Sequence, residues 1–483
     1  MQDIKFSKSL RDLTVSSIKW SGLRTIITNI IQVVVSIILA KLLTPEIFGI
    51  AALLNVIVTF SQILIISGFG TAIIQKKEIT PLDLNTIFIF NISISVTISL
   101  ILMLSANMIS GYFGILILKD LIPYYSLMIF ISSFSVVPRA VLARNMKYNK
   151  IALISIISIV VSGIVAVLLA FNGSGIWSIV GQQITYSISV SSMVLYSSKW
   201  RFNIRYSLKS IKTIGAFGFK LMLAQLFNAS TQGIINAILA KYYPMSALGI
   251  YDRSFRYSEL PSKIVKSIIS NVYLSSLSKI QDDTVRMFHY FNKTINYIYI
   301  FYTPGIFTLY IVFKLLVIFL GPIWEPMQPI FSILLVKAIF SPLHSLNLTI
   351  IKTRGKGNYL LIVEVIKKVL LLCVIVITFK FGILGLAVGQ LIAGFIEYLI
   401  NSLYTNKLFS IRWFYQIMVI IRSSFPFIIV LSVFELIFKV ASNYQGNIVM
   451  WLFGIFIYYI IIYHWQRASL KEIYTIIKKK GLA

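Results

Sequence analysis

The sequence has few charged residues, one cysteine and little histidine, and each shortage excludes a class of protein. Only 12% of its 483 residues are charged, about half the share of a soluble domain. The single cysteine, Cys373, excludes an internal disulfide. Three scattered histidines lack metal-ligand spacing, and we find no paired nucleophile and base and no phosphate-cradling glycine loop. The sequence therefore favours neither an enzyme nor an ATP-hydrolysing protein.

Long apolar runs recur along the chain and predict a protein embedded in a membrane. Apolar residues make up 58% of the sequence and aromatic residues 14%. Runs of about 20 residues are long enough to cross the hydrocarbon core as helices, and we count about 14 of them. They lie at 17–40, 47–69, 84–107, 122–138, 151–171, 175–197, 213–237, 248–275, 295–320, 325–350, 358–379, 381–404, 415–438 and 447–464.

Two sets of matching segments indicate an ancient duplication. Residues 38–41 and Gly49-Ile50 recur at an offset of 200 as 238–241 and Gly249-Ile250. At an offset of 208, Val180-Gly181-Gln182 recurs as Val388-Gly389-Gln390. The expected fold is all-α, with two six-helix lobes related by a pseudo-twofold axis along the membrane normal. The lobes would cover residues 1–200 and 201–410, and residues 411–483 would add two helices and a basic tail.

The distribution of lysine and arginine predicts the orientation in the membrane. Of 44 cations, about 27 fall in loops on the side of the N-terminus and about five in loops on the other side, which places both termini in the cytoplasm. The net charge of +29 has a simple alternative explanation, since loop cations also touch anionic lipid headgroups. The cations are dispersed over short loops, which argues against binding of nucleic acid.

About twelve cations remain inside predicted spans, where each is costly when it faces lipid. Those near the cytoplasmic ends can reach the interface, and Glu364 can pair with Lys367 or Lys368 within one turn. Four are harder to explain by position alone: Arg24 in the first predicted span, and Arg253, Arg256 and Lys263 in the eighth. Lys314 and Lys337 can line a cavity or merely pair with other groups, and the sequence does not decide between these roles.

Uncharged polar residues accompany these cations at helical spacing. The first span carries Gln32 on the same helical face as Arg24. The second span carries Asn55, and the seventh carries Gln225, Asn228 and Gln232. These polar faces should point inward. A wet cavity between the halves, lined by guanidinium groups, would suit an anionic phosphate. In the alternative reading, Asp252 and Glu259 neutralise Arg256 and Lys263, and the polar groups form a structural network.

Three segments in the first 150 residues carry a resemblance to a known family. They are Lys19-Trp20-Ser21-Gly22-Leu23-Arg24, the run 40–49 from Ala40 to Gly49, and the run 68–77 from Gly68 to Lys77. Residues 138–144 are similar to the basic loop that follows the fourth span in that family. Together they resemble Wzx-type polysaccharide (O-antigen) flippases of the multidrug/oligosaccharidyl-lipid/polysaccharide superfamily. The resemblance extends from about residue 10 to 405 in order and spacing and is closest to the branch of colanic acid and teichuronic acid exporters.

The resemblance implies a fold like that of multidrug and peptidoglycan-precursor transporters, and a transport function. The expected substrate is an undecaprenyl pyrophosphate-linked oligosaccharide. Alternating access would carry it from the cytoplasmic to the periplasmic leaflet of a bacterial inner membrane, for synthesis of lipopolysaccharide O-antigen, capsule or exopolysaccharide. Related peptidoglycan-precursor flippases carry arginines in the first, second and eighth spans. Arg24 matches the first and Arg253 or Arg256 the eighth, whereas the second span here has no cation. No cofactor is expected, and coupling to H⁺, Na⁺ or the membrane potential stays open. Expected partners are the lipid-linked substrate, membrane lipids and other polysaccharide assembly proteins.

Two alternatives come from other functional classes. A cation-coupled multidrug exporter of the same superfamily needs buried carboxylates, and acids within the predicted spans are few: Asp252, Glu259, Glu364, Glu397 and Glu435. A membrane-bound polysaccharide polymerase or glycosyltransferase needs a large outer loop or a dense acidic and histidine site, and the sequence has neither.

Overall fold

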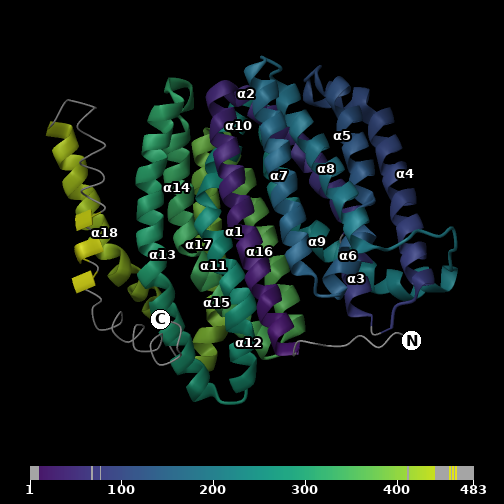
Figure 1. The fold of residues 1–483 in the computed structure, drawn as a ribbon. Coiled ribbons are helices and arrows are strands. Elements are labelled where there is room, and N and C mark those ends of the chain that lie inside the picture. The colour runs from purple at the N-terminus through teal and green to yellow at the C-terminus, as the bar shows by residue number, and fades with distance from the viewer. Residues whose placement is uncertain are drawn as a thin grey trace. The chain divides into compact units, whose positions relative to one another are not determined.

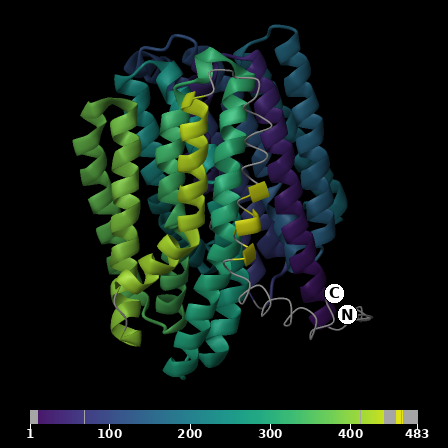
Figure 2. The ribbon, with the colours of Figure 1, turned by 90° about the vertical axis from the view of Figure 1, so that its left-hand side faces the viewer.

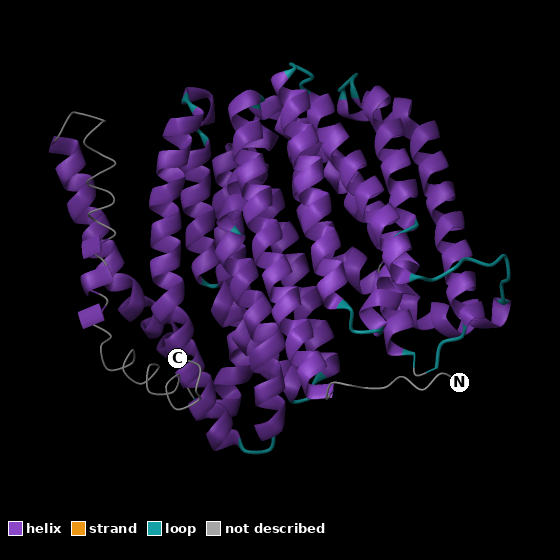
Figure 3. Ribbon diagram, in the orientation of Figure 1, coloured by secondary structure: helices purple, strands orange, loops and turns teal. Residues whose placement is uncertain are grey.

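Every regular element in the part of the chain that the structure describes is a helix (Figure 3). The structure is a computed structural model that describes residues 10–66, 69–76, 78–410 and 413–440, with 456–457, 459–461 and 463–464. The predicted spans from 17–40 to 415–438 all fall on helices, whereas the predicted span 447–464 lies largely outside the described residues. The all-α fold class is thus confirmed.

The chain forms two compact units, Met1–Asp252 and Arg253–Ala483. The lobes expected from the repeat, 1–200 and 201–410, stay a prediction. The first unit holds α1 (Leu10–Leu42), α2 (Pro45–Ile66), α3 (Phe69–Gln75), α4 (Pro81–Phe113), α5 (Leu118–Ser133), α6 (Val136–Arg144), α7 (Tyr148–Phe171), α8 (Ile176–Ser198), α9 (Leu208–Tyr242) and most of α10 (Met245–Ser258). In this unit α1, α7, α8, α5 and α4 pack side by side in that order (Figure 1).

The second unit begins inside α10, and breaks interrupt several of its spans. Its elements are α11 (Leu260–Ile268), a π-helical turn (Ile269–Tyr273), α12 (Leu274–Leu277), α13 (Thr284–Leu320), α14 (Met327–Ile339), α15 (Ser341–Thr353), α16 (Gly357–Thr378), α17 (Gly382–Phe409) and α18 (Trp413–Val440). Three 3₁₀ turns, Ser278–Ile280, Pro322–Trp324 and Phe379–Phe381, join some of them. Helices α16 and α17 form an antiparallel pair, drawn in green in Figure 2.

Seven helical segments among the described residues are long and apolar enough to cross a membrane. Apolar side chains on their outer faces agree with this, because Leu104 is 84% exposed and Met108 is 79% exposed on α4. In water such a surface would be unfavourable, whereas in lipid it is the expected one. The seven are Lys19–Leu42, Pro45–Ile65, Pro81–Phe113, Leu118–Arg144, Tyr148–Phe171, Thr284–Leu320 and Met327–Thr353.

The offset of 200 residues in the sequence reappears as a symmetric contact in the first unit. Gly49 lies so close to α10 that an added Cβ would come within 3.0 Å of the carbonyl oxygen of Met245. Gly249 lies in the same way against the carbonyl oxygen of Pro45 on α2. Each contact is the other shifted by 200 residues, which is the pattern of a two-fold contact between equivalent segments. Glycine permits this approach because it has no Cβ, and the contact supports the duplication.

The offset of 208 residues reappears in two helical pairs. Gly181 of α8 faces α7, where an added Cβ would meet the side chain of Leu169. Gly389 of α17 faces α16 at the side chain of Thr378. In both pairs a glycine lets the second helix approach the first closely. The two glycines of the sequence repeat therefore have the same structural role, which is to allow close packing of a helical pair in each unit.

One expectation about the first unit is wrong. Residues 138–144 resemble a basic loop in sequence, but they belong to α6, which is nine residues long. Its apolar side chains at Val137, Ala140 and Leu142 are buried, and Val137 and Ala140 pack with Ile73 and Phe88. Burial of this apolar face stabilises a helix where the charges alone indicate a loop.

Candidate functional site

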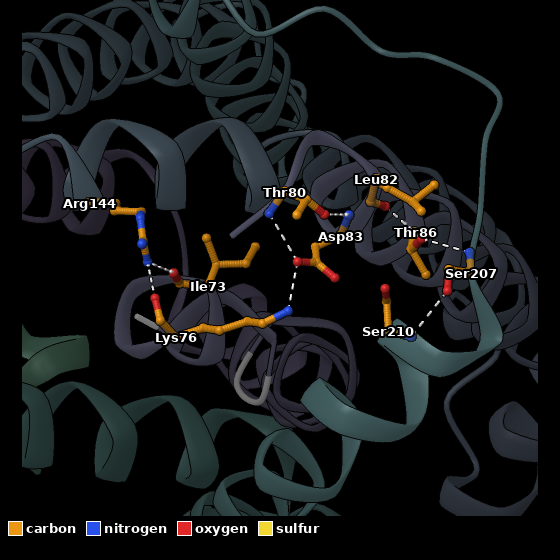
Figure 4. A network of polar contacts seen from close by, with 9 residues as sticks. All are labelled: Ile73, Lys76, Thr80, Leu82, Asp83, Thr86, Arg144, Ser207 and Ser210. Carbon is orange, nitrogen blue, oxygen red and sulfur yellow. Dashed lines mark hydrogen bonds and ion pairs between the residues drawn. The ribbon is translucent and has the colours of Figure 1, made fainter. Parts of the chain in front are cut away.

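Polar contacts at one end of the first unit join α3, α4 and α6 (Figure 4). Thr80 and Asp83 form a capping box at the start of α4, in which each side chain accepts from the other residue's backbone N–H. Asp83 also pairs with Lys76 at 2.7 Å. The guanidinium of Arg144 donates to the carbonyl oxygens of Ile73, at 2.7 Å, and Lys76. Because carbonyls at the end of a helix lack internal partners, Arg144 holds the end of α3 in place.

The same network fixes the segment that leads into α9. The hydroxyl of Thr86 accepts from the backbone N–H of Ser207 at 3.0 Å, and the side chain of Asn85 accepts from the backbone N–H of Asn203 at 3.3 Å. Ser207 in turn caps α9 by accepting from the N–H of Ser210. Figure 4 shows Thr86, Ser207 and Ser210 beside the Asp83 cap. These contacts are structural, because they bind backbone groups within the unit.

The predicted residues of α1 lie along one helix of the first unit. Arg24 is half-buried and Gln32 is exposed. The hydroxyl groups of Thr25 and Thr28 donate to carbonyl oxygens of the preceding turn, at 2.9 Å to Ser21 and 2.7 Å to Arg24. Their polarity is therefore satisfied within the helix. Arg24 and Gln32 have longer side chains, which can contact groups outside α1.

Helices α2 and α9 bring further predicted residues to the same unit. They pack where Gly233 of α9 meets Val56 and Phe60 of α2, next to Gln232 and Asn55. Asn55 and Gln232 are half-buried, and Gln232 donates to the side chain of Asn236 at 3.1 Å. Gln225 is exposed, and the side chain of Asn228 lies outside the described part of the chain. The uncharged polar residues of the two helices thus share one compact unit.

The predicted cations of the eighth span belong to the second unit. Arg253 is half-buried, whereas Arg256 and Lys263 are exposed. They lie on α10 and α11, which are separated by a break at Glu259. Arg24 lies in the first unit, so a single cavity that unites it with Arg253 and Arg256 stays a prediction.

A partly buried ionic cluster surrounds the break between α10 and α11. Glu259 pairs with Lys266 at 3.5 Å and with Lys337 of α14 at 3.8 Å. Lys337 donates to the side-chain oxygen of Gln390 on α17 at 2.8 Å, and its ammonium lies 5.2 Å from the ring centroid of Phe255. These partners explain how a lysine is tolerated in a membrane span. The cluster keeps one more cation than anion.

Two tyrosines of α13 bind backbone carbonyls at a second break, between α14 and α15, and one of them also contacts α11. Pro342 has no N–H to offer the carbonyl of Ala338, four residues earlier. The hydroxyl of Tyr302 donates to that carbonyl at 2.8 Å, and the hydroxyl of Tyr299 donates to the carbonyl of Ile339 at 2.6 Å. Tyr302 also contacts the hydroxyl of Ser262 on α11 at 3.2 Å. Interrupted helices whose free backbone groups are satisfied inside the protein are typical of transporter binding regions.

Sequence reasoning found part of this cluster. The sequence allows Lys337 either a cavity role or a pairing role, and the structure gives it Glu259 and Gln390 as partners. Glu364 does pair with Lys367, as its spacing predicts. In the sequence, Gln390 stands out only as part of the repeat at an offset of 208. No local spacing links it to Lys337, 53 residues away in the sequence, so only the fold brings them together.

Comparison with known proteins gives a consistent picture. A family model described as "Polysaccharide biosynthesis protein" matches residues 38–329. The chain is 25% identical to the lipopolysaccharide biosynthesis protein WzxC of Escherichia coli over 351 residues, which covers 70% of each protein. It is 22% identical to the teichuronic acid biosynthesis protein TuaB of Bacillus subtilis over 353 residues, with 72% of this chain and 73% of TuaB covered.

A solved structure extends the likeness to the fold. The lipid II flippase MurJ, in an inward closed conformation, matches with a TM-score of 0.74 at 17% identity. The match covers 94% of this chain and all of that one. The expected MurJ-like architecture is therefore confirmed. Since the family model covers more than half of the sequence, the chain belongs to the polysaccharide biosynthesis protein family of Wzx-type membrane transporters.

Proposed function

We propose that this protein moves a lipid-linked oligosaccharide from the cytoplasmic to the outer leaflet of a bacterial cytoplasmic membrane. The observation that carries the proposal is the family match over residues 38–329, to which the MurJ-like fold adds support. A sugar head group with a charged pyrophosphate cannot cross hydrocarbon unaided, because its polar groups would lose their water partners. A transporter with polar helix faces supplies those partners.

The basic residues of α1 and α10 are the proposed contacts for the pyrophosphate. Arginine's planar fork donates two parallel hydrogen bonds to phosphate oxygens. Arg24 and Arg253 are half-buried and Arg256 is exposed, so each retains surface for a ligand. Gln32, Asn55, Gln225, Asn228, Gln232 and Lys263 are the proposed lining for the sugars. The undecaprenyl carrier, the alternating-access cycle and the cytoplasmic position of both termini are parts of the same proposal.

The membrane potential is the simplest proposed driving force. An inside-negative potential favours outward movement of an anion by about 2.3 kcal/mol per charge per 100 mV. The second candidate, a multidrug exporter, finds less support. Two of the few acids within the spans, Glu259 and Glu364, are already held by lysines, which leaves few carboxylates for a cationic drug.

Loss of the arginines should stop export. In the Arg24→Ala variant and in the Arg253→Ala/Arg256→Ala variant, we expect surface polysaccharide to fall to background. Each charge-assisted hydrogen bond contributes about 1.5–3 kcal/mol, so the double variant should lose about a hundredfold or more in affinity. Surface polysaccharide is measured by antibody staining at matched protein levels. Lys119→Ala, at an exposed cation of a predicted outer loop, is the control and should export normally. Normal export by both arginine variants would refute the assignments.

A further inference from the structure

An apolar groove runs along the second unit between α11 and α13. It has a volume of about 870 Å³. Leu260, Ile264 and Ile268 form the α11 wall, and Phe301 and Gly305 belong to the α13 wall. Ile264, Ile268 and Phe301 are 50%, 53% and 61% exposed, so the groove opens sideways to the surroundings of the helices. In a membrane those surroundings are lipid.

The two walls are antiparallel and are joined at two points. Near the start of α11, Ser262 contacts the Tyr302 hydroxyl of α13 at 3.2 Å. Beyond the other end of α11, the ring of Tyr273 stacks on Tyr290 with centroids 5.5 Å apart. Because both walls are helices held at two points, the groove is a fixed feature of this unit.

A cation lies at one end of the groove and apolar residues at the other. Lys293 is exposed and lines the end near Tyr290, and its ammonium lies 5.7 Å from the ring centroid of Tyr297. The opposite end is lined by Leu309. A ligand that matches this pattern has an anionic head and a long apolar chain.

The length of the α13 wall, which continues beyond the nine-residue α11, separates two kinds of lipid. From Lys293 to Leu309, α13 rises about 24 Å at 1.5 Å per residue. The hydrocarbon core is about 30 Å thick, so a phospholipid chain that starts in one leaflet covers only about 15 Å. A chain that fills the whole groove must pass the middle of the bilayer. A long polyprenyl chain does this, whereas the acyl chain of one phospholipid does not.

We propose that the groove between α11 and α13 binds the prenyl chain of the lipid-linked substrate, with the pyrophosphate at Lys293. This inference rests on the proposed function and adds a binding site for the part of the substrate that never leaves the hydrocarbon. The prenyl chain lies along α13 while the pyrophosphate moves from Lys293 to the proposed arginine contacts. Recognition of the carrier then depends on chain length as well as on charge.

Cysteine labelling tests the proposal at both ends of the groove. The full-length Cys373→Ser protein receives Thr294→Cys near Lys293 or Gly305→Cys toward the far end, in phosphatidylcholine nanodiscs. Alkylation by a membrane-soluble maleimide is timed with undecaprenyl pyrophosphate, farnesyl pyrophosphate or phosphatidylglycerol. We expect undecaprenyl pyrophosphate to slow labelling at both positions, by about tenfold for a site that is nine-tenths occupied. Farnesyl pyrophosphate, with the same head and a much shorter chain, should protect only Thr294→Cys.

Two labelling results would overturn the proposal. Equal protection by phosphatidylglycerol would make the groove a general lipid site and overturn the proposal, as would unchanged labelling at Gly305→Cys. Gly111→Cys on α4, in the first unit, is the control and should react at one rate throughout. Transport by the cysteine-free protein is measured in parallel. Protection without transport would refute the proposed function alone, and transport without protection would refute the groove alone.

A filled groove gives a second test that does not depend on labelling. Nothing lies within 4 Å of a Cβ added at Gly305, so Gly305→Leu places its side chain in open space and should fold. We expect about tenfold weaker binding of undecaprenyl pyrophosphate, equivalent to about two displaced methylene groups, and unchanged binding of farnesyl pyrophosphate. Gly111 also has nothing within 4 Å, so Gly111→Leu is the matched control. Unchanged binding of the long carrier by Gly305→Leu would contradict the proposal.

Discussion

Gly249→Ala should unfold the protein at a markedly lower temperature than the wild type. The added Cβ would come closer than 3.0 Å to the carbonyl oxygen of Pro45. This oxygen belongs to the backbone of α2 and cannot rotate away as a flexible side chain would. Overpacking commonly costs about 1–3 kcal/mol, and overlap with backbone should reach or exceed the upper value. Gly49→Ala, against Met245, should behave alike. The unfolding temperature in detergent, followed by tryptophan fluorescence, measures the effect.

The double variant tests whether the two glycines share one contact. If both clashes are relieved by the same outward shift of α10 from α2, Gly49→Ala and Gly249→Ala together should cost clearly less than the sum of the single effects. Gly22→Ala and Gly111→Ala are matched controls, because nothing lies within 4 Å of a Cβ at either position. In helices this exchange stabilises by up to about 1 kcal/mol. Additive single effects would show that the glycines act separately, against the symmetric contact.

Removal of Glu259 should destabilise the second unit more than removal of Lys337. Glu259→Ala leaves Lys337 in a membrane span with Gln390 and the Phe255 ring as its described partners. An uncompensated buried charge costs about 3–5 kcal/mol. Lys337→Met leaves Glu259 paired with Lys266, at the more exposed side of the cluster, so its cost should be smaller. Chemical unfolding of the purified variants in detergent gives both free energies.

A double variant at Glu259 and Lys337 shows whether the carboxylate is needed only to compensate the charge of Lys337. Glu259→Leu/Lys337→Met replaces the pair by apolar side chains, and replacement of both partners is often neutral. We expect it to be more stable than Glu259→Ala. If it is as unstable as the single variant, the break at Glu259 depends on the carboxylate itself and not on compensation of Lys337. A similar stability for Glu259→Ala and wild type would show that water already solvates the cluster.

The positions of the helices and the internal repeat could be predicted from the sequence. Apolar runs of fixed length predict spans because the bilayer imposes that length. The match of Gly49 to Gly249 predicts equivalent environments, and the structure places both in one reciprocal contact. Burial was harder to foresee. Residues 138–144 look like a basic loop until α6 buries Val137 and Leu142.

The candidate site was less accessible from the sequence. Spacing within one helix predicts pairs such as Glu364 with Lys367, but the partners of Lys337 come from α11 and α17. Local spacing relates Glu259 to Lys263, and the fold adds Lys266 and Lys337 as ion-pair partners of the same carboxylate. The hydroxyl of Tyr302, which takes the place of the N–H that Pro342 lacks, gave no sequence signal. Such contacts depend on how helices pack, and periodicity alone does not contain that information.

Transport by the purified protein, with no other protein present, can be measured in vesicles. The purified protein is reconstituted into vesicles that contain an undecaprenyl pyrophosphate-linked oligosaccharide, and an impermeant lectin titrates the sugar exposed outside over time. With an inside-negative potential, we predict that the exposed fraction rises above half in wild-type vesicles and stays near half in vesicles with the Arg24→Ala/Arg253→Ala/Arg256→Ala variant. Wild-type vesicles that behave like protein-free vesicles would contradict the account.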